Sequence, residues 1–167
     1  MRGTASTLSA VVVLTETHKG QTDAETLPMS VKGSDAVPAE PAARATKTEI
    51  QWLIDRHDGA PNFEMRKFRI RAGGRIPKHY HRDVEHEQYV LKGRYSVGIG
   101  DRVYEVKAGD SLYIPAGMVH WYDNGANEEA EFICVIPRKE NYDAVYLEEE
   151  ESETAPTKPN ASQPSSC

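Results

Sequence analysis

The strongest constraint on the fold of this chain is the spacing of three histidines in the stretch from Gly73 to Gly93, GGRIPKHYHRDVEHEQYVLKG. His79 and His81 are two residues apart, so both rings point to one face if this part of the chain is an extended strand. His86 follows a short polar link, at the head of the run EHEQYVL, which is typical of a second strand. Two strands would therefore bring three imidazoles together.

A fourth histidine lies in a second stretch, Gly109 to Asn124, which reads GDSLYIPAGMVHWYDN. If a third element carries His120 to the other three rings, the four imidazoles form a site for a transition metal ion. The alternative is that these histidines are packed or surface residues that hold no ion. The two remaining histidines, His18 and His57, lie in a polar arm and in a turn, and we interpret both as solvated.

The two stretches resemble the two sequence motifs of the cupin superfamily. In the first, five residues separate Gly73 from the sequence His79-Tyr80-His81, and Gly93 closes the motif. In the second, the matching positions are Gly109, Pro115, Gly117, His120 and Asn124. The resemblance covers roughly residues 51–138 and implies an antiparallel jelly-roll barrel.

The first motif departs from the family pattern at one position, where the usual ligand set has a glutamate. Six residues separate His86 from Gly93, so His86 takes that position, and strand parity puts Glu85 and Glu87 on the opposite face. Either glutamate would orient a histidine from behind or be solvated. The chain thus resembles small bacterial single-domain cupins with all-histidine sites, some of which bind manganese. The metal ligands implied are His79, His81, His86 and His120.

The resemblance implies a divalent transition metal, with manganese as the expected ion and iron, nickel, copper or zinc as alternatives. An octahedral ion held by four imidazoles keeps two open positions, whereas a tetrahedral zinc ion would be saturated and chemically closed. Around the ion, strand parity nominates a mostly apolar pocket wall with one amide. Its candidate residues are Ile76, Gln88, Phe132 and Cys134. The alternative for each is plain core packing.

Alternating apolar and polar residues predict short strands in the runs EIQWLI, FEMRKFRIRA, RYSVGI, SLYIP and AEFICVIP. The pair Gly73-Gly74 predicts a tight turn before the histidine strand, and Gly100-Asp101 predicts a hairpin. No helical periodicity is present in this part of the chain. The fold class expected is therefore all-β, with a single antiparallel jelly-roll barrel.

Composition divides the chain into a barrel at residues 47–147 and two tails. Residues 1–46 are expected to form a disordered or loosely ordered arm, and residues 148–167 an acidic disordered tail. The apolar run Leu8 to Leu14 in the arm is a weak signal-peptide core, a loose strand or part of a disordered arm. We favour a cytoplasmic location, with export as the alternative.

The net charge of −6 and a pI near 5.5 argue against nucleic acid or an anionic membrane as a partner. The two cysteines, Cys134 and Cys167, are too few and too badly placed for a disulfide scaffold. No apolar run approaches the ~20 residues of a membrane span. The expected partners are a small-molecule substrate and, by family analogy and from apolar strands such as FICVI, a second copy of the chain in a homodimer.

Two classes of function follow. The first is a metal-dependent oxidoreductase, dioxygenase-like or peroxide-using, that acts on a small organic substrate. The second is a non-redox role as an isomerase, a lyase, or a ligand-binding or sensor module. The fold alone does not choose between them, because one fold hosts many functions. No catalytic residue is assigned from the sequence.

Overall fold

The computed structural model describes residues 30–147. The predictions for the apolar run Leu8 to Leu14, for Cys167 and for the acidic tail lie outside this range. The described chain forms ten strands and two short 3-10 helices, and it contains no α-helix. Within this part of the chain, no helix has the length and apolar character needed to cross a bilayer.

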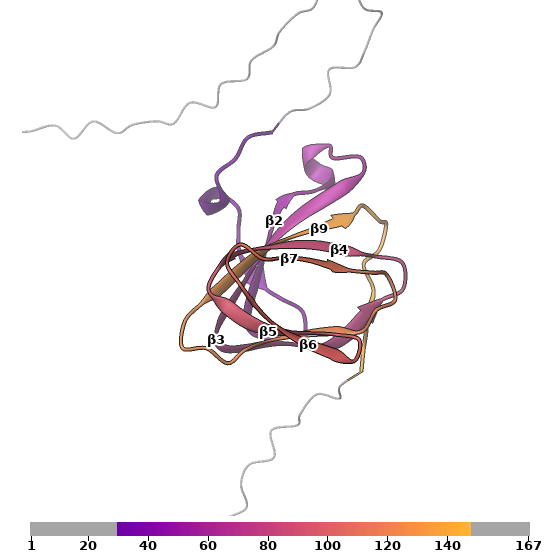
Figure 1. Ribbon diagram of the computed structural model, residues 1–167. Coiled ribbons are helices and arrows are strands. Elements are labelled where there is room, and N and C mark those ends of the chain that lie inside the picture. Colours follow the sequence, from indigo (N-terminus) through magenta and orange to yellow (C-terminus); the bar gives the residue numbers. More distant parts are fainter. Residues whose placement is uncertain (1–29, 148–167) are drawn as a thin grey trace, which may run out of the picture.

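Every strand pairs in antiparallel fashion, in the order β6-β5-β8-β3-β9-β4-β7, with β2 and β10 also paired to β3 and β1 paired to β2. The curled sheet forms a barrel, with β4, β7 and β9 on one side and β5 and β6 on the opposite side (Figure 1). This confirms the predicted jelly roll. The strands are β1 Glu40–Pro41, β2 Thr46–Ile54, β3 Phe63–His81, β4 His86–Lys92, β5 Arg94–Ile99, β6 Arg102–Lys107, β7 Ser111–Ile114, β8 His120–Asn124, β9 Ala130–Pro137 and β10 Ala144–Tyr146. The helices are η1 Ser34–Ala36 and η2 Arg56–Asp58.

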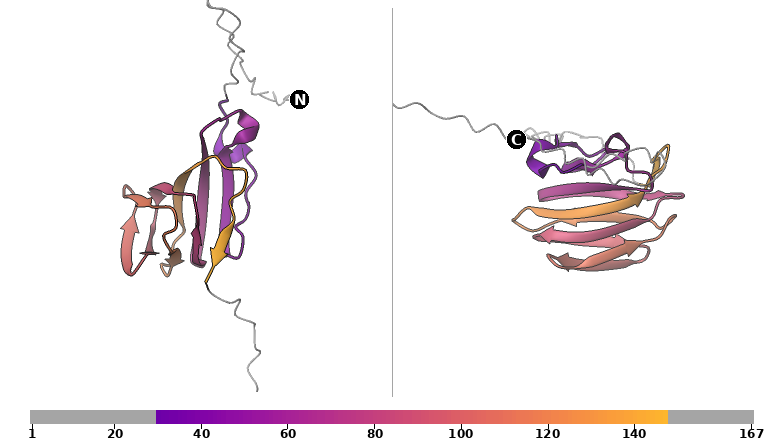
Figure 2. Two further views of the ribbon diagram at one scale, coloured as in Figure 1. Left: turned by 90° about the vertical axis from the view of Figure 1, so that its right-hand side faces the viewer. Right: turned by 90° about the horizontal axis from the view of Figure 1, so that it is seen from above.

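The prediction of a tight turn at Gly73-Gly74 is wrong, because β3 continues through both glycines. Up to Ile70 this strand pairs with β2 and β9, and from Gly74 onward it pairs with β8. Gly73 has φ +68, a left-handed conformation that glycine adopts without steric cost, so the strand bends there instead of reversing. The long β2 and β3 run side by side (left view of Figure 2). One strand thereby carries residues from the core to the histidine site.

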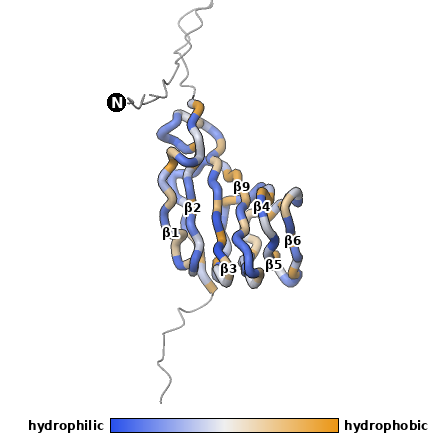
Figure 3. Tube along the Cα trace, turned by 90° about the vertical axis from the view of Figure 1, so that its left-hand side faces the viewer, coloured by the Kyte–Doolittle hydropathy of each residue, from blue (hydrophilic) through white to orange (hydrophobic). Residues whose placement is uncertain are grey.

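The interior of the barrel follows strand parity. Burial alternates residue by residue along β9 and along the first part of β4, as expected for strands with one face inside. Stacked aromatic rings occupy part of the interior: Phe68 and Tyr122 both stack on Phe132, with ring centroids 5.0 and 5.3 Å away. β1 and β2 lie on one flank of the barrel, and β5 and β6 on the other (Figure 3).

The described part of the N-terminal arm is attached to the barrel. β1 pairs with β2, and the side-chain amide of Gln51 donates hydrogen bonds to the carbonyls of Ser34 and Val37. The hydroxyl of Tyr146 in β10 donates a 3.2 Å hydrogen bond to the carbonyl of Ala43. Structured chain therefore begins before residue 47, and β10 adds a short strand that the sequence pattern did not indicate.

Candidate metal centre

Three strands bring the four predicted histidines together. His79 and His81 lie at the end of β3, His86 begins β4, and His120 begins β8. His79 pairs directly with His120 across the β3–β8 ladder, and their ring centroids are 4.2 Å apart. The ring of His86 lies 5.0 Å from that of His81 and 4.9 Å from that of His120. All four side chains are buried, with exposures between 2% and 9%.

The closest part of this cluster is the three-histidine group of His79, His81 and His120, whose ligating nitrogens all lie within 4.8 Å of one another. His86 is not within that limit, although its ring lies beside two members of the group. The distances fit a metal site in which three rings converge and a fourth stands next to them.

Backbone carbonyls fix the orientation of the three-histidine group. Nδ1 of His79 lies 2.8 Å from the carbonyl of Pro77, Nδ1 of His120 lies 2.9 Å from that of Met118, and Nδ1 of His81 lies 3.2 Å from that of Asp143. A carbonyl oxygen only accepts, so each Nδ1 carries the hydrogen and each Nε2 keeps a free lone pair. This is the arrangement that holds metal-binding imidazoles in place.

His86 has a different environment. Its Nδ1 lies 3.7 Å from Sγ of Cys134 and 3.4 Å from Nη2 of Arg66, and its Nε2 is buried without a hydrogen-bond partner among the described residues. A guanidinium only donates, so the Arg66 contact uses an Nδ1 that accepts and leaves the hydrogen on Nε2, whereas donation from Nδ1 to the sulfur leaves Nε2 with a free lone pair. A buried nitrogen without a partner is costly, and an ion at Nε2 would satisfy it.

Burial keeps these imidazoles neutral. It lowers the pKa of His81 to about 4 and that of His120 to about 3, and it lowers the pKa values of His79 and His86 as well. Neighbouring positive charge acts in the same direction. Metal ions bind the neutral ring, so the four histidines are in their ligating form at pH 7.

A cavity of about 410 Å³ adjoins the four rings. The four residues predicted for the pocket wall, Ile76, Gln88, Phe132 and Cys134, all line it. Nε2 of Gln88 donates a 2.6 Å hydrogen bond to the hydroxyl of Tyr122, while its Oε1 has no partner among the described residues. The amide of Gln88 is thus tied to Tyr122 on one side and leaves a buried acceptor on the other.

Comparison with known proteins decides the family. The family model described as "Cupin domain" matches residues 66–136. The structure of the polyketide cyclase RemF from Streptomyces resistomycificus superposes with a TM-score of 0.68 and 31% identity, over 74% of this chain and 88% of that one. This chain belongs to the cupin superfamily.

Sequence relatives of this cupin match shorter segments. The polyketide synthase CurC from Streptomyces cyaneus is 36% identical over 64 residues, which cover 38% of this chain and 42% of that protein. An acireductone dioxygenase from Xylella fastidiosa is 33% identical over 104 residues, covering 53% of this chain and 52% of that protein. The cupin described here spans about half the length of the curated relatives it matches.

The two glutamates beside His86 lie on the outer side of the cupin barrel. Glu87 is exposed, and Glu85 accepts a 3.0 Å hydrogen bond from the hydroxyl of Tyr113 on that same face. Neither carboxylate lines the cavity. His57 is also solvated, with 85% of its side chain exposed, next to Asp55.

The cavity of this cupin contains residues that sequence reasoning missed. Arg66 adds a guanidinium to a wall predicted to hold one amide, and Trp52, Tyr142 and Tyr146 add aromatic rings. A signal for Arg66 was available: strand parity puts it on the inward face of FEMRKFRIRA, where an arginine is unexpected. Nothing in the sequence pattern indicated that Glu40–Pro41 of the arm would reach the cavity.

Proposed function

We propose that this cupin is a metal-dependent oxidoreductase that acts on a small organic substrate in the barrel cavity, at an ion held by His79, His81, His86 and His120. The observation that carries the proposal is the three-histidine group: three ligating nitrogens within 4.8 Å of one another, with each Nδ1 held by a backbone carbonyl. The buried Nε2 of His86, which has no hydrogen-bond partner among the described residues, supports His86 as a fourth ligand.

The donor set supports a divalent transition metal, and we propose manganese. Imidazole nitrogens bind iron, nickel, copper and zinc more strongly than manganese, so site geometry and metal availability in the cell select among these ions, and the family resemblance is what favours manganese. When bound, such an ion would supply Lewis-acid polarisation of a chelating substrate. Backbone carbonyls hold the rings of His79, His81 and His120 in the ligating tautomer, burial keeps all four rings neutral, and aromatic residues line the cavity that would receive the substrate.

Similarity to an acireductone dioxygenase supports the redox reading. A second candidate is a non-redox reaction, an isomerisation, a lyase reaction or a cyclisation, and the likeness to the polyketide cyclase RemF favours it. A ligand-binding or sensor role uses the same cavity without turnover. Conversion of a substrate in air but not under nitrogen would separate the oxidoreductase from the other roles.

Elemental analysis and X-ray absorption of protein purified without added metal test the proposal. We expect about one transition metal ion per chain, with nitrogen ligands and additional oxygen ligands beyond them. The His120→Ala variant should lose the ion, and the matched His57→Ala variant, altered at an exposed ring, should keep it. A four-coordinate, saturated ion would overturn the oxidoreductase proposal, because no position would remain for a substrate.

A homodimer is part of the proposal. Family analogy supports it, and so do exposed apolar side chains on the outer face of the paired strands β4 and β7, namely Tyr89, Leu91 and Tyr113. The run FICVI does not support it, because Phe132, Cys134 and Ile136 point into the core. A sedimentation mass of one chain at micromolar concentration would exclude the dimer. A cytoplasmic location stays a prediction.

A further inference from the structure

Arg66 is a buried cation on the cavity wall, and no carboxylate within residues 30–147 pairs with it. Its side chain comes from the inward face of β3, and the residue is only 8% exposed. The guanidinium lies over the rings of Trp52 and Phe68, 5.4 and 5.3 Å from their centroids. Its polar contacts are Sγ of Cys134 at 3.1 Å and Nδ1 of His86 at 3.4 Å, and its Nε has no partner among the described residues.

The charge of Arg66 is not balanced by the described protein. A buried charge is expensive unless an opposite charge or a full set of hydrogen bonds compensates it. The nearby buried carboxylate of Glu64 is already engaged by Arg56 and Tyr142. Among the described residues that line the cavity, Glu40 is the one carboxylate, and it is exposed. A neutral sulfur and an imidazole do not replace a counter-charge.

Aromatic rings adjoin this cation. Phe68 and Phe132 stack with an interplanar angle of 11°, and Tyr122 and Phe132 stack at 15°. Trp52 closes the wall beside Arg66. A guanidinium presents a rigid fork that matches the two oxygens of a carboxylate. The cavity therefore combines a guanidinium, whose Nη2 also contacts Cys134 and His86, with closely spaced and nearly parallel aromatic rings in its wall.

We infer that Arg66 is the anion-binding residue of the cavity and that the substrate is a planar, unsaturated organic acid whose carboxylate pairs with it. The inference rests on the proposed function only in that the far end of the acid would reach the metal centre. Arg66 binds and orients the substrate, and its own interaction with an anion does not require an ion at the histidines.

Three small probes test this: benzoate, its neutral counterpart benzamide, and the non-planar anion cyclohexanecarboxylate. Each is titrated into the full chain, metal-free and manganese-loaded, and binding is followed by tryptophan fluorescence, since Trp52 lines the cavity. We expect benzoate to bind more tightly than both other probes. Arg66→Met should weaken benzoate on the order of 10- to 100-fold, to the level of benzamide, because a hydrogen bond to a charged group is lost.

Arg69→Met is the matched control. Arg69 lies on the same strand but on its other face, paired with Glu131 at 2.9 Å, and its removal should leave benzoate affinity unchanged. Arg66→Lys keeps the charge without the fork and should give an intermediate loss. Equal affinity of the unmodified protein for benzoate and benzamide would overturn the inference even if Arg66→Met failed to fold, and equal affinity for cyclohexanecarboxylate would remove the planar requirement.

The metal-free titration separates this inference from the proposed function. Arg66-dependent benzoate binding by a protein that retains no metal would support the anion site and count against the oxidoreductase. A metal-loaded protein that binds benzoate no better than benzamide would contradict the anion site at Arg66 and leave the proposed metal centre standing.

Discussion

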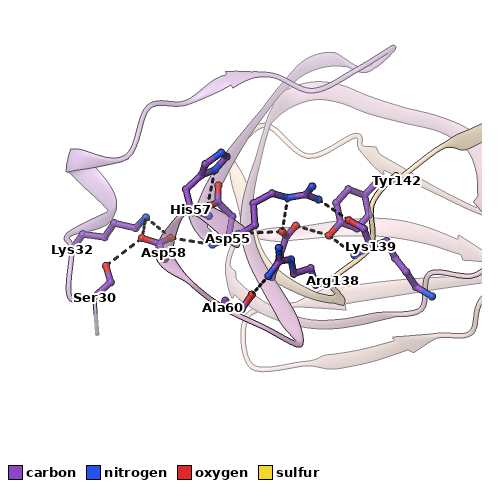
Figure 4. A network of polar contacts seen from close by, with 11 residues as sticks. Ser30, Lys32, Asp55, His57, Asp58, Ala60, Arg138, Lys139 and Tyr142 are labelled. Atoms are coloured by element: carbon purple, nitrogen blue, oxygen red, sulfur yellow. Dashed lines mark hydrogen bonds and ion pairs between the residues drawn. The ribbon is translucent and has the colours of Figure 1, made fainter. Parts of the chain in front are cut away.

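The hydroxyl of Tyr142 donates a 2.6 Å hydrogen bond to Oε2 of Glu64, a carboxylate with only 1% exposure. The same hydroxyl accepts a 3.0 Å hydrogen bond from the backbone N–H of Lys139, and Arg56 reaches the carbonyl of Lys139 at 2.6 Å. These contacts join the chain after β9 to η2 and the start of β3 (Figure 4). Since Tyr142 lines the cavity, the network fixes part of its wall.

Removing this hydroxyl should destabilise the protein. Tyr142→Phe leaves a buried carboxylate without its shortest hydrogen bond, and we expect the free energy of unfolding to fall by about 1.5–3 kcal/mol. The control is Tyr113→Phe, which removes a hydroxyl bonded to Glu85 on the exposed surface and should cost less than about 0.5 kcal/mol. Chemical denaturation measures both. Equal losses in the two variants would show that burial of Glu64 does not increase the contribution of this hydrogen bond to the free energy of unfolding.

The stability of the metal-free protein should fall as the pH falls from about 6.5 to 5. Burial lowers the pKa of His81 to about 4 and that of His120 to about 3 in the folded state, whereas an unfolded histidine titrates near ~6.5. In this window the unfolded chain binds protons that the folded chain does not, so protonation favours unfolding. The free energy of unfolding is therefore unaffected by these histidines well above pH 6.5 and decreases progressively as the pH falls below it.

Thermal unfolding of metal-free protein at several pH values measures this dependence. His81→Gln removes one buried titrating ring, so its melting temperature should vary less between pH 6.5 and 5. His57→Gln, altered at an exposed ring, should keep the slope of the unmodified protein. A melting temperature that is constant or rises on acidification would contradict the assignment of neutral, buried imidazoles.

Alternation along single strands predicted which residues face inward, whereas the jelly roll and the convergence of the histidines were implied by the resemblance to the cupin motifs. Parity sets the face on which His79 and His120 lie, and the non-local pairing of β3 with β8 brings the two rings together. The bend at Gly73 was mistaken for a turn because positive φ serves both, and only the partners of β3 distinguish them. The role of Arg66 depends on which carboxylates are near it in space, and the reach of β1 depends on non-local pairing. Neither leaves a periodic signal.

The position of the N-terminal boundary also follows from non-local contacts. We predict that the barrel folds without the segments outside residues 30–147, whereas the described part of the arm adds contacts: β1 pairs with β2, and Arg44 lies 4.7 Å from the centre of the Tyr146 ring. Deleting residues 1–29 and 148–167 should therefore change the melting temperature by only a few degrees. Extending the N-terminal deletion to residue 44 should lower it clearly further. Calorimetry compares the two, and an equal effect would mean that β1 adds no stability.

The contrast between His86 and Glu87 tests the ligand set. His86 points into the barrel with an orphaned Nε2, whereas Glu87 is exposed on the outer face of the same strand. His86→Ala should therefore weaken manganese binding strongly, by at least the ~10–100-fold that loss of an outer partner typically costs. Glu87→Gln should leave binding unchanged. Metal content and the electron spin resonance spectrum of manganese-loaded protein report both. Retained, unaltered metal in His86→Ala together with loss in Glu87→Gln would show that the register of β4 differs by one residue, with Glu87 in place of His86 as the ligand. It would also restore the three-histidine, one-glutamate set that is usual for the family.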